Sequence, residues 1–147
     1  MAFMPDMILA DMKSRSKRQA LDELAEAAAN AAGVAKSEVL DALTARERLG
    51  TTGVGQGVAL PHARLPGIDR LYSVFGRAAE AIPFDAVDDK PVDLFFLLLA
   101  PEEASAEHLK ALARVARLLR DADMCARLRG ADSAEAIQAL LSPRAAA

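Results

Sequence analysis

Two spacings of hydrophobic residues divide the chain into expected helices and expected strands. Apolar positions three and four residues apart, typical of a helix with one buried face, occur over residues 16–32 and 105–120. Short, nearly continuous apolar runs instead indicate buried strands, and these cover residues 7–12, 57–60, 71–79 and 92–100. The run at 92–100 is apolar on both faces, as expected of a central strand that helices cover on both sides.

Capping and turn residues set the ends of these elements. The serines within residues 14–16 offer an N-cap to the first helix, and Gly33 is placed to end it. A second helix is expected from near Ser37 to near Leu49, and shorter ones over 123–129 and 133–141, followed by a loose tail. Helices before, between and after mostly apolar strands predict an α/β sandwich.

The helix expected over residues 105–120 contains one of the two histidines of the chain. Its inner face is expected to consist of Leu109, Leu112, Val115, Ala116 and Leu119. The same spacings place His108 on or beside that face. His108 is then either a core residue bonded to a backbone carbonyl, or a pocket residue if the start of the helix packs over the carboxyl ends of the strands.

Composition and charge narrow the functional class. With 147 residues, 52% hydrophobic and 27% charged, the chain is expected to form one domain. A net charge of −3 gives no electrostatic case for nucleic-acid binding. No apolar run reaches the ~20 residues that a membrane span requires, so no membrane insertion is expected. The single cysteine, Cys125, excludes an internal disulfide, suits the cytoplasm and is interpreted as a small core residue.

The densest group of chemically useful residues lies between Arg46 and His62. A loop rich in glycine over residues 50–57 can turn sharply and direct backbone N–H groups at a bound anion. Within it, Thr51 and Thr52 add hydroxyl donors. Arg46 adds a planar cation and His62 a nucleophilic nitrogen. Together these are the parts needed to accept a phosphoryl group onto a side chain.

The place of His62 in the chain suits a nucleophile. Pro61 fixes its own φ and has no N–H group, so the strand over 57–60 is expected to stop there and present His62 at its carboxyl edge. Attack requires a neutral imidazole, which an ordinary pKa of about 6.5 makes the majority state. The alternative is a histidine that only hydrogen-bonds its neighbours, with Arg46 and Arg48 at a solvated helix end.

Other chemistries have less support. The two histidines with Glu107 or Asp85 could ligate zinc, but no H-x-E, HExxH or CxxC spacing is present, so no metal or other cofactor is expected. The glycine loop precedes a strand and lacks a following Gly-Lys-Ser/Thr, so it matches neither a P-loop nor a dinucleotide-binding loop. The sequence shows no serine or cysteine nucleophile paired with a base, so it gives no support for a hydrolase.

The stretch TARERLGTTGVGQGVALPHAR over residues 44–64 resembles the signature of enzyme IIA domains of the fructose/mannitol class of the bacterial phosphotransferase system. The segment IPFDAVDDKPVDLFFLLLAP over residues 82–101, and His108-Leu with the helix that follows, are also similar to that family. The resemblance covers about residues 8–141 and is greatest to the nitrogen-regulatory enzyme IIA. Three positions depart from it: Gln56, Ala63 and Arg64 stand where related chains usually carry Asn, Gly and Lys.

The resemblance implies one domain over residues 1–147, a three-layer α/β/α sandwich with a mixed β-sheet. It implies a phosphohistidine at Nε2 of His62, accepted from an HPr-like phosphocarrier protein. At matching positions, Arg46 and His108 would hold the phosphate, with Thr51 and Thr52 in the adjoining loop.

The expected output is regulatory, because a phosphate charge changes which protein targets a small docking face binds. Arg64 and Leu65 are the residues expected at that face. The same chemistry would also serve a fructose- or mannitol-type enzyme IIA that relays phosphate to a IIB protein in sugar uptake. A third alternative is a binding module on the same fold that has lost phosphoryl transfer.

Overall fold

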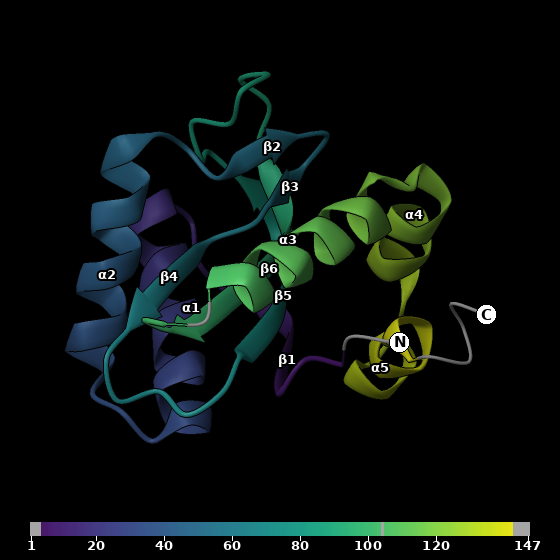
Figure 1. The fold of residues 1–147 in the computed structure, drawn as a ribbon. Coiled ribbons are helices and arrows are strands. Elements are labelled where there is room, and N and C mark those ends of the chain that lie inside the picture. The colour runs from purple at the N-terminus through teal and green to yellow at the C-terminus, as the bar shows by residue number, and fades with distance from the viewer. Residues whose placement is uncertain (1–3, 104, 143–147) are drawn as a thin grey trace.

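The longest apolar run of the chain forms the centre of a mixed sheet. A computed structural model describes residues 4–103 and 105–142. In chain order the elements are β1 Met7–Met12, α1 Lys17–Ala32, α2 Lys36–Leu49, β2 Gly53–Gly55, β3 Val58–Ala59, β4 His62–Leu65, β5 Tyr72–Ile82, β6 Val92–Pro101, α3 Ser105–Arg120, α4 Ala122–Gly130 and α5 Ala134–Leu141 (Figure 1). The strands lie in the order β1-β5-β6-β3-β2, and β4 pairs with β6.

Side chains of β6 alternate between two hydrophobic clusters. Leu94, Phe96 and Leu98 pack toward α3, α4 and α5, and the residues between them pack toward α1 and α2. All of these β6 side chains are fully buried, as the two-faced apolar run predicts. The expected α/β/α sandwich with a mixed sheet is therefore confirmed: β5 is antiparallel to β6, whereas β3 and β4 are parallel to it.

The strand expected to end before Pro61 does end there, as β3, and a second strand, β4, begins directly after Pro61. Val58 pairs with Leu94 and His62 with Leu98, so β3 and β4 keep one constant register along β6. Pro61 interrupts the ladder because it has no N–H group, but its carbonyl still accepts the Leu98 N–H at 3.0 Å. The predicted stop before Pro61 is therefore confirmed, whereas the prediction that His62 lies at the carboxyl edge of the strand was wrong, because His62 opens β4.

The capping residues of α1 act as the sequence predicts. Ser16 accepts the Gln19 N–H at the start of α1, and Gly33 ends the helix in the left-handed conformation with φ 72°. Ser133 caps α5 in the same way. One inner-face prediction was wrong: Leu109 of α3 is 63% exposed, and His108 takes the buried position one residue earlier.

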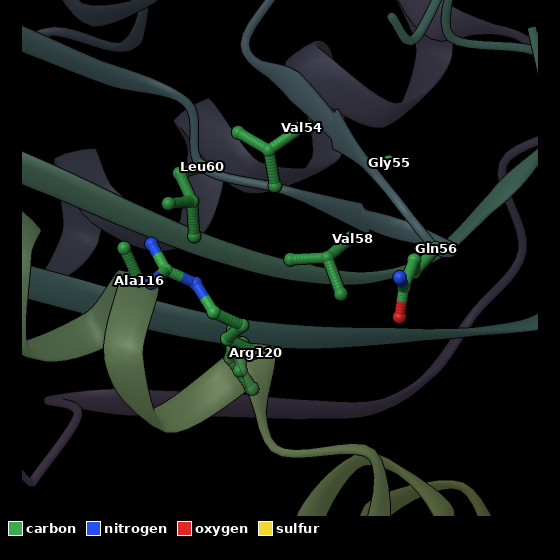
Figure 2. Close-up of a pocket in the computed structure, with 8 residues that line it drawn as sticks. Val54, Gly55, Gln56, Val58, Leu60, Ala116 and Arg120 are labelled. Atoms are coloured by element: carbon green, nitrogen blue, oxygen red, sulfur yellow. The ribbon is translucent and has the colours of Figure 1, made fainter. Parts of the chain in front are cut away.

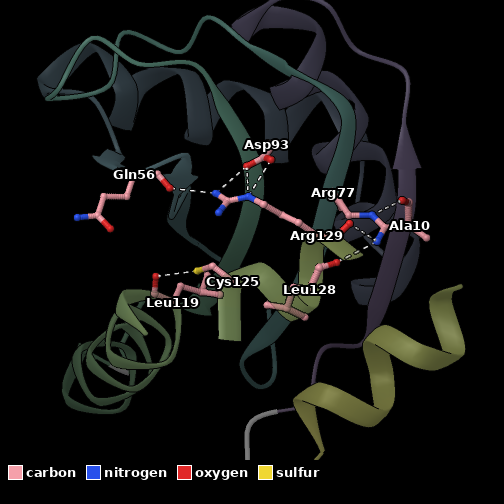
Figure 3. Close-up of polar contacts among 8 residues, drawn as sticks. All are labelled: Ala10, Gln56, Arg77, Asp93, Leu119, Cys125, Leu128 and Arg129. Atoms are coloured by element: carbon pink, nitrogen blue, oxygen red, sulfur yellow. Dashed lines mark hydrogen bonds and ion pairs between the residues drawn. The ribbon is translucent and has the colours of Figure 1, made fainter. Parts of the chain in front are cut away.

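Two arginines hold α4 and the β2–β3 hairpin to the sheet (Figure 3). Arg77 of β5 donates to the carbonyls of Ala10 in β1, at 3.0 Å, and Leu128 in α4, at 2.9 Å. A cation is favourable there because the last carbonyls of a helix carry its partial negative charge. Arg129 forms a bidentate pair with Asp93 of β6, and its Nη2 also donates to the Gln56 carbonyl at 3.0 Å. These bonds join the C-terminal end of α4 to strands β5 and β6 and to the β2–β3 hairpin.

The remaining differences concern element ends. β2 lies within the glycine loop, where a strand was not expected, and β5 runs three residues further than expected, to Ile82. Within the described ranges 4–103 and 105–142, no helix is long and apolar enough to cross a membrane. Most of the expected tail, residues 143–147, lies outside the described residues.

Candidate functional site

His62 is held by one hydrogen bond at each ring nitrogen. Its Nδ1 lies 2.8 Å from the Leu60 carbonyl oxygen, and its Nε2 lies 3.2 Å from Nε of Arg46. A carbonyl oxygen only accepts and a guanidinium only donates, so Nδ1 carries the proton and Nε2 carries the lone pair. The structure therefore selects the tautomer in which Nε2 is the nucleophilic nitrogen.

Arg46 reaches His62 from the last turn of α2, which packs against β4. Its Nη1 donates to the Gly50 carbonyl at 2.8 Å, just beyond the end of the helix. The Gly50 N–H in turn donates to the Glu47 carbonyl at 3.1 Å. The guanidinium is thus fixed between the helix end and the imidazole, whereas Arg48 of the same turn is exposed.

The surroundings of His62 keep its ring neutral. Burial lowers the pKa of His62 below its usual 6.5, and the positive charges of Arg46 and Arg64 lower it further. The hydrogen bond to the Leu60 carbonyl and the negative charge of Glu47 oppose this shift. With the pKa below 6.5, the unprotonated ring is the dominant form at pH 7, which is the form that can attack an electrophile.

His108 closes another side of the site from the start of α3. It is 3% exposed, and its ring centroid lies 5.4 Å from that of His62, with the ring planes at 89°. Burial, together with the charges of His62 and Arg64, lowers the pKa of His108 to about 4. Among the described residues neither ring nitrogen has a hydrogen-bond partner. The neutral ring therefore holds a buried N–H with no acceptor, which is uncommon in a folded protein.

The two threonines of the glycine loop already have partners within the protein. The Thr51 hydroxyl donates to the Phe84 carbonyl at 3.2 Å and accepts the Gly53 N–H at 3.0 Å. The Thr52 hydroxyl and N–H both contact the carboxylate of Glu47. The structure thus brings together His62, Arg46 and His108, while it ties the threonine hydroxyls to the scaffold around them.

The sequence matches, over residues 1–143, the protein family described as Phosphoenolpyruvate-dependent sugar phosphotransferase system, EIIA 2. The chain belongs to this family. The resemblance found in the residues around His62 is thereby confirmed, and proteins of the enzyme IIA family act in phosphoryl transfer.

Relatives of this enzyme IIA chain carry two kinds of name. A "Nitrogen regulatory protein" of Bradyrhizobium diazoefficiens is 51% identical over 138 residues, which cover 94% of this chain and 90% of that protein. A "PTS system fructose-specific EIIA component" of Haloferax volcanii is 36% identical over 138 residues, covering 93% and 90%. The crystal structure of nitrogen regulatory protein IIA-Ntr from Neisseria meningitidis superposes with a TM-score of 0.87 at 38% identity and covers 93% of each chain.

The two residues expected at a docking face of the enzyme IIA chain differ in accessibility. Arg64 is exposed beside His62, as a contact residue must be. Leu65, the next residue of β4, is 7% exposed and packs in the core under α1 and α2, because alternate residues of a strand point to opposite faces. The accessible apolar side chains near the site are instead Leu109 beside His108 and Leu49 at the end of α2.

A hollow of about 350 Å³ lies beside the site, between the β2–β3 hairpin and the second half of α3 (Figure 2). Its lining consists of Val54, Gly55, Gln56, Val58, Leu60, Ala116, Leu119 and Arg120. Leu60 joins the two places, since its side chain lines the hollow while its carbonyl holds His62. The hollow itself is lined by neither Arg46 nor His108 and is distinct from the group around His62.

Two other chemistries considered from the sequence concern Cys125 and a metal. Cys125 is buried, its thiol donates to the Leu119 carbonyl at 3.1 Å, and burial raises the pKa of the thiol, so it is the core residue that was expected. Across the part of the chain that the structure describes, no group of three His, Cys, Asp or Glu side chains is placed to hold a metal ion.

Sequence reasoning missed two residues of the site. Leu60 acts through its backbone carbonyl, so its side-chain type carried no signal of that role. Glu47 lies between two arginines at a helix end, a pattern that indicates a solvated surface, yet its side chain is buried. The only sequence signal for Glu47 was its position within the stretch that resembles the family signature.

Proposed function

We propose that the chain is a regulatory phosphocarrier that accepts a phosphoryl group on Nε2 of His62 from the phosphohistidine of an HPr-like carrier protein. The observation that carries this proposal is the pair of hydrogen bonds on the ring: the Leu60 carbonyl holds Nδ1–H, so the lone pair is on Nε2, on the side of the ring where Arg46 lies. Membership of the enzyme IIA family supports the same chemistry.

The transfer balances without an external proton. The lone pair of His62 Nε2 forms a bond to phosphorus as the donor's N–P bond breaks, and that bonding pair returns to the donor's ring nitrogen. The Nδ1 proton of His62 stays in place, so the phosphorylated ring is cationic, and the Leu60 carbonyl stabilises that ring at 2.8 Å. Neither water nor a metal ion is needed to balance the step.

Arg46 and His108 hold the transferred group. The Nε–H of Arg46, which donates to Nε2 in the free protein, donates to a phosphoryl oxygen once Nε2 is bonded to phosphorus. The unpartnered N–H of His108 gains an acceptor in the same oxygens. Thr51 and Thr52 contribute through the shape of the loop, since their hydroxyls bind Phe84 and Glu47.

Protein partners meet the site in the cytoplasm across its exposed rim. We expect Arg64 to be a rim contact of the carrier and of downstream targets, with Leu109 in place of the buried Leu65. A phosphate charge of about −2 at the centre of this rim changes which partner binds. Relatives named nitrogen regulatory protein favour such an output.

The second candidate function is sugar uptake, in which the phosphate passes on to a IIB protein. It is favoured by the 36% identity to a protein named fructose-specific EIIA component. Incubating the phosphorylated chain with purified fructose- or mannitol-type IIB protein separates the two functions. Rapid loss of phosphate to IIB supports uptake, whereas retention supports regulation.

The decisive experiment is intact-mass analysis after incubation with enzyme I, an HPr-like carrier and phosphoenolpyruvate, for wild type, His62→Ala and His108→Ala. We expect an acid-labile gain of one phosphate that is lost in His62→Ala and formed more slowly in His108→Ala. A wild-type chain that stays unmodified with several carriers contradicts the transfer mechanism and favours the non-catalytic binding module.

A further inference from the structure

Glu47, in the last turn of α2, is a buried carboxylate that contacts both α1 and the glycine loop. Its side chain is 6% exposed. Oε1 accepts the Lys17 ammonium at 2.9 Å and the Thr52 N–H at 3.1 Å, and Oε2 accepts the Thr52 hydroxyl. Lys17 also lies over the ring of Phe84, 4.7 Å from its centroid. A buried charge is retained only when it is paired and hydrogen-bonded, and Glu47 meets both conditions.

One series of hydrogen bonds leads from Glu47 to Nδ1 of His62. Glu47 holds Thr52 by its N–H and its hydroxyl. The carbonyl of Thr52 accepts the Leu60 N–H at 2.9 Å, and the carbonyl of Leu60 accepts Nδ1–H of His62 at 2.8 Å. The direction of the Leu60 carbonyl, which fixes the tautomer of the ring, thus depends on where Glu47 places Thr52.

A second series leads from Glu47 to Nε2 of the same ring. Glu47 and Arg46 are adjacent in the last turn of α2, and each holds one end of the three residues that follow the helix. Glu47 binds Thr52, and Arg46 binds the Gly50 carbonyl at 2.8 Å. With the loop fixed in this way, the guanidinium is oriented so that Nε of Arg46 lies 3.2 Å from Nε2 of His62.

We propose that Glu47 is a positioning residue that sets the tautomer and orientation of His62 through both of its ring nitrogens. Lys17 pairs with the carboxylate and offsets part of the negative charge that would repel an incoming phosphoryl group. The effect on transfer rate rests on the proposed function, whereas the effect on the ring does not.

The test is a ¹⁵N NMR titration of the two imidazole rings, combined with the rate of phosphoryl acceptance. Four variants are compared with wild type: Glu47→Ala, Glu47→Gln, Thr52→Val and the control Glu38→Gln. Glu38 is exposed in the first turn of the same helix, so its variant matches the chemical change away from the site. Circular dichroism and urea unfolding establish that each variant is folded under the conditions of measurement.

We expect wild-type His62 to be protonated at Nδ1 when neutral. Glu47→Ala should populate both tautomers and accept phosphate roughly 10- to 100-fold more slowly, as expected when a reacting group is misplaced. Glu47→Gln should restore the tautomer, because its amide can still bind the N–H and hydroxyl of Thr52. In both Glu47 variants the pKa of His62 should fall, because the charge that raises it is gone. Glu38→Gln should match wild type throughout.

Two outcomes would overturn the positioning role. A His62 ring that stays fully Nδ1-protonated in Glu47→Ala shows that the carboxylate serves stability alone. If Glu47→Ala does not fold, an unchanged tautomer and an unchanged rate in Thr52→Val contradict the proposal instead. If wild type accepts no phosphate, the proposed function fails, while the NMR titration still decides the role of Glu47.

Discussion

Acid should destabilise the fold through protonation of His108. The pKa of His108 is about 4 in the folded state and returns to about 6.5 in the unfolded chain. The unfolded state therefore takes up the proton first as the pH falls, and the free energy of unfolding decreases between pH 6.5 and pH 4. Below pH 4 both states are protonated and this group contributes no further change. The difference between the folded and unfolded pKa values of His108 corresponds to about 3 kcal/mol of unfolding free energy. Most of this free energy is lost between pH 7 and pH 4.5.

Urea unfolding at pH 7, 5.5 and 4.5, followed by far-UV circular dichroism, measures this loss. The chain has two histidines, so two variants are compared with wild type: His108→Leu, and His108→Leu combined with His62→Gln. The comparison separates the pH dependence due to each histidine from that due to the carboxylates. We expect wild type to lose roughly 2–3 kcal/mol more than His108→Leu between pH 7 and pH 4.5. Equal losses in the two proteins would refute the conclusion that His108 is buried and neutral.

Four further predictions concern single residues. Arg46→Ala should slow phosphoryl acceptance in the mass assay by about 10²- to 10³-fold, as for loss of a preorganised donor, whereas Arg48→Ala of the same turn should leave the rate near wild type. Gly76→Ala should lower the free energy of unfolding in urea by about 1–3 kcal/mol, since its Cβ would lie 2.5 Å from a buried methionine sulfur. Gly130→Ala, where a Cβ meets nothing within 4 Å among the described residues, should raise it by about 0.5–1 kcal/mol; a loss there would contradict the geometry. Leu109→Ser should raise the carrier concentration needed for half-maximal rate without lowering stability, and an unchanged value would exclude Leu109 from the docking face.

The sequence was sufficient for those parts of the fold that local pattern determines. A strand apolar on both faces has to lie in the middle of a covered sheet, and β6 does. Ser16 begins α1 because its hydroxyl can accept a free backbone N–H, and Gly33 ends it because glycine adopts the left-handed conformation easily. Local rules failed where a long-range contact decided the outcome: β6 offers partners on both sides of Pro61, so the strand resumes in the same register.

The helix α3 shows another limit of periodicity. Two stripes, one through Leu109 and one through His108, fit the three- and four-residue spacing equally well. In the structure the stripe through His108 is the buried one, and the ring of His108 lies 5.4 Å from that of His62. In the site, side-chain chemistry identified His62 and Arg46 as candidates, whereas the backbone carbonyl of Leu60 and the burial of Glu47 depend on how distant segments meet.

The brevity of β2 also determines how other proteins can recognise this molecule. At this side of the sheet the outermost strand has only three residues, and the Gly53 carbonyl already accepts the Val87 N–H at 3.0 Å. The neighbouring β4 packs against α2. Little backbone remains there for a foreign strand to pair with, so a protein partner at this side would be selected by the shape and charge of side chains. Such a surface can release one partner and admit the next without breaking a hydrogen-bonded ladder.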